Sequence, residues 1–342
     1  MAANRNGPTP PENATLADVA EHVGVSARTV SRVVNNQGGC TAETRDRILA
    51  AIDELGYRPN LMARGLSKRR SDTIGLVSIA MLDPFFPEFA DGVERAASDL
   101  GRTMFLASTG GDLVRQQSAL KSMVGHGVEG AIVFPAAHTV GDLVDFAAKE
   151  MPIIIVNDDV QGVRISSVSA EIQAGAEMAV NHLLRGGRKR VAALLDRGAR
   201  NAPRPARREL GYRNALEAEG LGPDQHLIID VDNSLEGGRV GLDEALAQPN
   251  PPDALFAYND LIAIGALQRA LDRGISVPDD LAIVGFDDIE MCQAMTPMLT
   301  SVRVDRDQLG RVAVDMIRTL VEEGSVPSRR LPVELVVRAS AP

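Results

Sequence analysis

Arg28 and Arg32 lie one helical turn apart and are the side chains in this sequence best suited to reading DNA bases. A guanidinium can donate two hydrogen bonds to O6 and N7 of guanine, which discriminates a base by about 1–3 kcal/mol. Short polar side chains around these arginines suit phosphate oxygens instead, namely Ser26, Thr29, Ser31 and Asn35. This chemistry requires a helix that presents both arginines on its outer face.

The residues around these arginines predict three short helices. Thr15 is a good N-cap, and apolar residues recur at helical spacing over residues 16–23. Gly24 can adopt the positive φ of a tight turn before a second helix over residues 27–34. A third amphipathic helix follows between Thr41 and Gly56. Two short helices around a glycine turn, completed by a third, predict an all-α helix-turn-helix headpiece.

The second helix of such a motif enters the major groove with its N-terminal residues toward the base edges. Ala27, Arg28 and Arg32 are therefore expected to contact bases, and Thr15 is expected to contact DNA as well. The alternative is that these are solvated polar positions of a small helical bundle.

The distribution of charge favours the DNA-binding interpretation. The chain carries a net charge of −10, but residues 13–71 hold nine Arg and Lys against six Asp and Glu. Since residues 1–12 are neutral, the head carries +3 and residues 72–342 carry −13. A locally positive head suits phosphate binding, and an acidic body stays away from DNA.

Beyond residue 72 the pattern predicts an α/β body. Short β-branched runs alternate with amphipathic helical stretches, which indicates parallel sheets with crossover helices. The predicted strands cover residues 74–80, 103–108, 130–134, 153–156, 190–195, 254–258 and 282–285. Because this run is too long for one sheet, we expect two doubly wound parallel sheets that divide near residues 163–167.

Several classes of protein are disfavoured. The cysteines Cys40 and Cys292 are far apart, without the spacing of a zinc site or a disulfide framework, so no metal is expected. No phosphate-binding loop, GxSxG elbow or metal-ligand spacing of histidines occurs, and neither an enzyme nor a cofactor is expected. Without an export signal or an apolar run of membrane length, we expect a cytoplasmic protein that does not contact membranes.

The head resembles the LacI/GalR family of transcription regulators. The stretches that carry this resemblance are TLADVAEHVGVSARTVSRVVNN from residue 15 and TAETRDRILAAIDELGYRPNLMARGLS from residue 41. In that family, the stretch matching residues 58–66 is a hinge helix that folds on operator DNA in a dimer. The resemblance implies DNA contacts from Asn60, Ala63, Arg64 and Leu66, with Leu66 wedged into the minor groove at the central base step.

The body resembles the periplasmic-binding-protein-like type I sensor domain of the same family. The matching motifs include residues 83–86, 128–133, 156–158, 258–266 and 284–288. The resemblance implies an N-terminal extension (1–12), a helix-turn-helix domain (13–58), a hinge helix and linker (59–71) and a sensor and dimerisation domain (72–342). Within the sensor, the N-lobe is expected at about 72–163 and 305–329 and the C-lobe at about 165–303 and 331–342.

Side chains at the ends of the predicted strands could bind a polyol. Carboxylates accept hydroxyl hydrogens, guanidinium groups donate to oxygens, and aromatic rings cover the apolar face of a sugar. Asp287 and Arg208 match ligand positions of the family, whereas Asn233 departs from an aromatic residue common there. The expected effector-binding residues are Asp83, Phe85, Phe86, Asn157, Arg208, Asn233, Asn259 and Asp287.

These observations predict a sequence-specific transcription regulator, a repressor, whose partners are a second copy of the chain, double-stranded operator DNA with an inverted repeat, and a small effector, a sugar or sugar derivative. One alternative is the same fold controlled by a partner protein or a non-sugar metabolite. A sugar-binding transport protein is another, but it would have no use for the head.

Overall fold

The computed structural model describes residues 14–35, 37–58, 71–136, 140–200, 206–222 and 226–342. The chain divides between Ser71 and Asp72 into two compact units, and each unit is described on its own. The predicted extension, residues 1–12, and the predicted hinge, apart from Ser71, lie outside the described residues. Among the residues described, no helix has both the length and the apolar character needed to span a bilayer.

The head is a bundle of three helices, α1 (Leu16–Val23), α2 (Ala27–Val34) and α3 (Ala42–Leu55). Val19, Val30 and Ile48, one from each helix, are almost fully buried in its core. Gly24 ends α1 with a φ of 73°, which allows α2 to turn back on α1 without the strain a side chain would add. The three-helix headpiece predicted from the sequence is confirmed.

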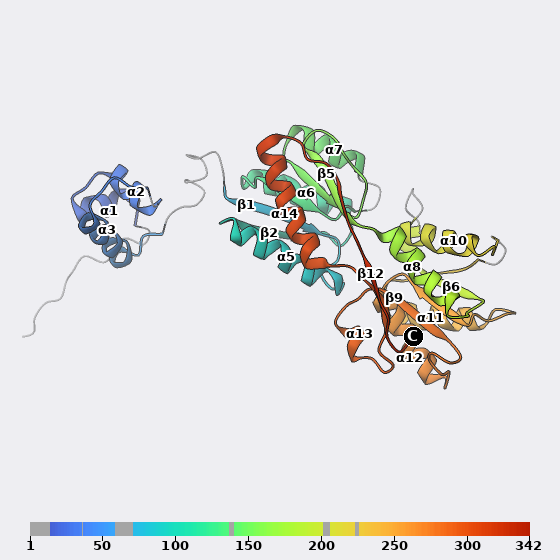
Figure 1. Ribbon diagram of the computed structural model, residues 1–342. Coiled ribbons are helices and arrows are strands. Elements are labelled where there is room, and N and C mark those ends of the chain that lie inside the picture. Colours follow the sequence, from blue (N-terminus) through green and yellow to red (C-terminus); the bar gives the residue numbers. More distant parts are fainter. Residues whose placement is uncertain (1–13, 36, 59–70, 137–139, 201–205, 223–225) are drawn as a thin grey trace, which may run out of the picture. The chain divides into compact units, whose positions relative to one another are not determined.

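The N-lobe of the body is a six-stranded sheet between two layers of helices (Figure 1). The strand order is β11-β5-β4-β3-β1-β2, and each pair of neighbouring strands is parallel. Side chains of β3 and β4 alternate between the α5/α14 face and the α6/α7 face. The elements are β1 (Thr73–Ser78), α5 (Phe85–Asp99), β2 (Thr103–Ser108), α6 (Leu113–Gly125), β3 (Gly130–Val133), α7 (Val140–Lys149), β4 (Ile153–Val156), β5 (Ile165–Ala170), α14 (Arg306–Glu323) and β11 (Arg329–Leu331).

The C-lobe repeats this architecture with strand order β12-β10-β9-β8-β6-β7. Helices α8 and α10 cover one face, and α11 and α12 cover the other. The edge strand β12 is antiparallel to β10, so this sheet is mostly rather than wholly parallel. The elements are α8 (Ile172–Arg185), β6 (Val191–Asp196), α9 (Arg197–Arg200), α10 (Arg207–Ala218), β7 (Leu227–Val231), α11 (Leu235–Leu246), β8 (Ala254–Ala257), α12 (Asp260–Asp272), β9 (Ala282–Asp287), α13 (Met291–Ala294), β10 (Thr300–Arg303) and β12 (Glu334–Val336).

The boundary between the lobes differs from the sequence prediction. Residues 165–170 form β5 of the N-lobe, so the first crossing lies at Glu171 rather than at residues 163–167. Three serines made this strand look like a linker, yet all six of its residues are buried. The serine hydroxyls are accommodated because Ser166 and Ser167 hydrogen-bond to Ser328. Leu331 also belongs to the N-lobe, because it pairs with Ala170 of β5. The last crossing between the lobes follows it.

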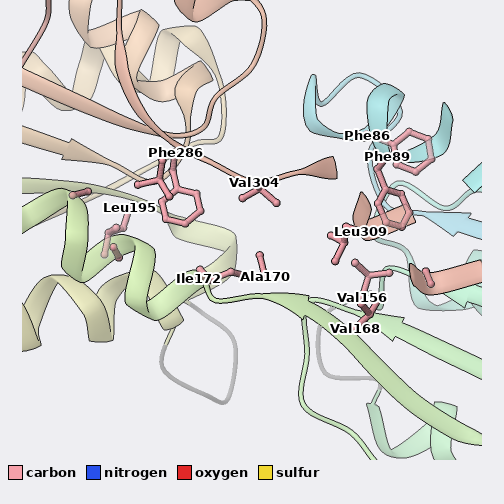
Figure 2. Close-up of a cluster of buried hydrophobic side chains, with 14 of the residues drawn as sticks. Phe86, Phe89, Val156, Val168, Ala170, Ile172, Leu195, Phe286, Val304 and Leu309 are labelled. Atoms are coloured by element: carbon pink, nitrogen blue, oxygen red, sulfur yellow. The ribbon is translucent and has the colours of Figure 1, made fainter. Parts of the chain in front are cut away.

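One hydrophobic core runs from lobe to lobe through the crossing segments. Figure 2 shows Ala170, Ile172 and Val304 between the N-lobe side chains around Phe89 and the C-lobe side chains around Phe286. Within the described chain the crossings lie at Glu171, at residues 304–305 and at residues 332–333. The lobes therefore share apolar packing where the chain passes between them.

Two helices of the N-lobe, α5 and α14, pack with their backbones in close contact. A Cβ atom built on Gly92 of α5 would lie 2.6 Å from the carbonyl oxygen of Asp307, and one on Gly310 of α14 would lie 2.6 Å from that of Phe89. Neither helix can accept a side chain here without moving away from its partner.

We predict that Gly310→Ala lowers the free energy of unfolding by about 1–3 kcal/mol, because the added methyl group overpacks the contact between α5 and α14. Urea denaturation measures the change. Gly125→Ala in α6 is the control, since nothing lies within 4 Å of its built Cβ. An unchanged or raised stability of Gly310→Ala would contradict the close packing.

Candidate DNA-binding surface and ligand site

Helix α2 of the head has one buried and one exposed face. Val30 and Val33 are buried, while Ala27, Arg28 and Arg32 are exposed. The side chains predicted to contact bases therefore lie on the solvent face of the helix.

The predicted phosphate contacts have structural roles in the head. Ser26 caps α2 by accepting a hydrogen bond from the backbone N–H of Thr29, and the two hydroxyl groups lie 2.8 Å apart. Asn35 donates from Nδ2 to the carbonyl oxygen of Ser31 at 2.7 Å. Hydroxyl groups can serve as caps and still accept or donate further bonds, so these roles are compatible with phosphate contact.

Thr15 forms a capping box with Asp18 at the start of α1. Its backbone N–H donates to the Asp18 carboxylate at 2.7 Å, and these bonds hold the pKa of Asp18 below its ordinary value. The four residues predicted from the hinge lie outside the described residues, namely Asn60, Ala63, Arg64 and Leu66.

In the C-lobe, Arg208 and Asp287 form a buried ion pair. The Nη2 atom of Arg208 in α10 donates to Oδ1 of Asp287, the last residue of β9, at 3.0 Å. The side chains are only 12% and 7% exposed. The guanidinium carbon lies 4.2 Å from the ring centroid of Tyr258 and 4.2 Å from that of Phe286. Stacking between two rings holds the guanidinium plane in one orientation.

The electrostatic environment of Asp287 reflects its burial. Loss of water raises the pKa of its carboxyl, the Arg208 guanidinium opposes this rise, and the charge of Asp83 adds to it. Arg306 also lowers the pKa of Asp287. Asp83 belongs to the N-lobe, so charges from both lobes act on the same carboxylate.

The other predicted ligand residues follow strands in both lobes. Asn259 begins α12, where its Oδ1 caps the helix and its Nδ2 donates to Oδ1 of Asn233 at 2.8 Å. Asp83 accepts a bond from the backbone N–H of Phe85 at 3.0 Å. Phe86 is buried and packs edge-on against Phe134, whereas Phe85 is half-buried. Of the predicted aromatics, Phe85 is thus the more accessible.

Two buried polar atoms of the predicted ligand residues have no hydrogen-bond partner among the described residues. They are Oδ1 of Asn157, directly after β4, and Nε of Arg208. Asn157 also has a φ of 61°, in the left-handed region. The hydrogen-bonding capacity of each of the two atoms is therefore unmet within the described residues.

A second buried carboxylate, Asp260, lies behind the loop that follows β9. Burial and the nearby charge of Asp287 raise its pKa to about 7. Its oxygens accept bonds from Oγ of Ser301 at 2.5 Å and from the backbone N–H of Ile289 at 2.8 Å. Asp260 holds that loop in place and is a positioning residue. Across the described residues, no group of three His, Cys, Asp or Glu side chains is arranged to hold a metal ion.

Tyr258 and Phe286 lie against Arg208 of the candidate site, and the sequence analysis named neither. Tyr258 directly follows β8, at the carboxyl end of the strand, where the other candidate ligand residues also lie. Its position in the sequence could therefore have indicated a role in the site. Phe286 lies within β9 and reads as an ordinary core residue, because only the fold brings it to Arg208. Arg306 was not named either, because only the fold brings this residue of the N-lobe helix α14 to the backbone of Asp287.

A three-helix DNA-binding head joined to a two-lobed sensor defines the class of ligand-responsive DNA-binding regulators. Residues 15–60 match the family model of bacterial regulatory proteins of the lacI family. Residues 180–341 match the model of a periplasmic-binding-protein-like domain. The chain belongs to the LacI family, which confirms the resemblance found in the sequence.

Relatives support this assignment along the whole chain. The HTH-type transcriptional regulator DegA of Bacillus subtilis is 34% identical over 95% of this chain and 97% of its own. Catabolite control protein A of Priestia megaterium is 30% identical over 96% and 99%. A lac repressor dimer bound to operator and the anti-inducer ONPF is 27% identical, covers 96% of this chain and 99% of its own, and gives a TM-score of 0.85. These relatives are regulators rather than enzymes.

We predict that Asp260→Asn changes how stability depends on pH. The folded pKa of Asp260, about 7, exceeds the value of 3.8 expected when unfolded, so the folded chain retains a proton that the unfolded chain loses. The contribution of Asp260 to the free energy of unfolding is fully present below its unfolded pKa of 3.8. It is lost as the pH rises toward its folded pKa of about 7.

Between these two pKa values, the free energy of unfolding of the wild type should fall relative to that of Asp260→Asn by up to about 1.4 kcal/mol per pH unit. Denaturation of both proteins at several pH values measures the difference. A difference that stays constant over this range would show that Asp260 is ionised in the folded protein.

Proposed function

We propose that this protein is a cytoplasmic repressor that binds an inverted-repeat operator as a homodimer and responds to a sugar or sugar derivative. The observation that carries the proposal is the exposed arginine pair on α2, set on a helix whose opposite face is buried in the head. Such a helix can enter the major groove without disturbing the core.

The base contacts follow from the geometry of α2. Arg28 and Arg32 lie four residues apart, so their side chains project from neighbouring turns of the same face. Each can bind O6 and N7 of a guanine. Ala27, at the N-terminus of the helix, leaves room for the base edges or contacts a thymine methyl group.

The chemistry of the ligand site favours an uncharged polyol. Asp287 and Asp83 bring two carboxylates to the site, where the stacked guanidinium of Arg208 is paired with Asp287 and Arg306 is shared with Glu88. A phosphate group is negatively charged at neutral pH and would be repelled by those carboxylates. A hydroxyl group both donates and accepts hydrogen bonds without adding negative charge, so a neutral sugar suits these carboxylates better than its phosphate ester does.

The names of relatives agree with a sugar as ligand. One relative is the ribose operon repressor of Escherichia coli, 30% identical over 96% of this chain. A cellobiose complex of the transcriptional regulator CelR is 28% identical, covers 96% of this chain, and gives a TM-score of 0.70. Control by a partner protein or a non-sugar metabolite is the remaining alternative, and ligand titration separates it from the proposal. A transport protein is disfavoured because it would not need the head.

We predict that Arg28→Ala relaxes base preference at one position in each half-site of the operator. The duplexes bound by each protein would be selected from a random library at near-physiological salt and sequenced. The wild type should enrich an inverted repeat, and the variant should lose the preference at a single symmetric position, at a cost of about 1–3 kcal/mol for the preferred base.

Arg47→Ala is the matched control, because Arg47 is an exposed cation of α3 and not of the helix expected to enter the groove. Removing this charge should weaken binding to all duplexes without altering the selected sequence. A uniform loss with Arg28→Ala, like that of the control, would refute direct base contact by Arg28.

We predict that an unmodified sugar, and not its phosphate ester, raises the melting temperature of the protein. Affinity for that sugar, measured by calorimetry, should fall roughly tenfold or more in Asp287→Asn, because a charged hydrogen-bond acceptor is lost. The control is Asp253→Asn, since Asp253 accepts bonds from Lys189 and Arg190 before β6 and β8 begin, at the opposite edge of the sheet. Tighter binding of phosphate esters would contradict the proposed ligand class.

A further inference from the structure

Arg306 lies at the point where the chain enters the N-lobe for the second time. It is the first residue of α14 and follows the crossing at residues 304–305. Its side chain is only 5% exposed. A buried guanidinium must find partners for its donors, so the identity of those partners is informative.

The partners of Arg306 belong to different lobes. On the C-lobe side, Nη1 donates to the carbonyl oxygen of Asp287 and Nη2 donates to that of Asp288 at 3.1 Å. On the N-lobe side, Nε donates to Oε2 of Glu88 in α5 at 2.9 Å, and Nη2 lies 2.7 Å from the same oxygen. One planar group thus binds the loop after β9 and helix α5 at once.

The backbone that Arg306 holds is unusual. Asp287 and Asp288 have φ values of 100° and 52°, which side-chain-bearing residues rarely adopt. In this conformation both carbonyl oxygens reach the same guanidinium. The carboxylate of Asp287 is paired with Arg208, so Arg306 holds the backbone of a residue whose side chain belongs to the ion pair.

Motion of Arg306 must be shared by α5. Helices α5 and α14 are in backbone contact at Gly92 and Gly310, too close to admit a side chain. Glu88 adds an ion pair at the start of α5. The two helices are therefore expected to move as one body when the loop after β9 moves.

We propose that Arg306 is a positioning residue that sets the angle between the lobes by tying the backbone of Asp287 and Asp288 to Glu88 of α5. A ligand that shifts Asp287 would pull on α5 and α14 through this guanidinium. The inference goes beyond the proposed function, because it concerns the lobe angle whether or not the protein binds a sugar or DNA.

Two other arginines bind the same loop but do not join the two lobes. Arg303 and Arg338 also bind Asp288, through its carboxylate, at 2.7 Å and 2.6 Å. Their guanidinium groups also bind Glu334 and the carbonyl oxygen of Leu299, which lie in the C-lobe as well. Arg303 is therefore a matched control that acts on the same loop within one lobe.

The test is the distance between spin labels on the two lobes, measured by pulsed electron paramagnetic resonance on the full chain. Labels are attached to cysteines introduced at Ala148 of α7 and Glu217 of α10, both exposed, in a Cys40→Ser background; Cys292 is fully buried. Labelled chains are mixed with excess unlabelled protein so that distances within one chain dominate. Neither ligand nor operator is needed.

Arg306→Met should shift or broaden the distance distribution, whereas Arg303→Met should give the wild-type distribution. Glu88→Gln, which keeps the buried arginine but weakens its N-lobe contact, should produce a smaller change in the same direction and serves if Arg306→Met fails to fold. Wild-type distributions for Arg306→Met and Glu88→Gln, or an equal shift for Arg303→Met, would overturn the proposal.

Discussion

The carboxylate of Asp287 is removed from water, and a buried charge is stable only when it has well-placed partners. Arg208 supplies the opposite charge, and the rings of Tyr258 and Phe286 fix the guanidinium in place. Arg306 binds the backbone of the same residue from the other lobe. The proposed ligand site and the junction between the lobes therefore meet at one residue, through which occupancy of the site would act on both lobes.

The three helices of the head and seven of the twelve strands in the described chain were predictable, because local sequence signals agree with the fold there. The caps Thr15, Ser26 and Thr41 begin the three helices of the head where they were expected. In the body, β2 and β4 have the predicted bounds, and other predicted strands differ by a few residues at their ends. Arg208 and Asp287 were also singled out, but as family ligand positions and not as partners of each other.

The remainder could not be predicted because it depends on contacts between distant segments. Strand β5 looks polar in sequence, and only its pairing with β4 and β11 makes its serines internal. Arg306 reads as an ordinary surface residue of an amphipathic helix, yet it is buried because the chain crosses between lobes just before it. Nothing in its neighbours along the chain points to Glu88 or to the carbonyl oxygens of Asp287 and Asp288.

If the sensor controls the head, ligand binding in the sensor changes operator binding by the head. The most direct measurement is the dissociation constant of the selected operator duplex with and without a saturating concentration of the sugar that stabilises the protein. We expect saturating sugar to change the operator dissociation constant by about 5- to 150-fold. Bound operator should change the dissociation constant of the sugar by the same factor. An operator dissociation constant that stays the same at saturating sugar would contradict it.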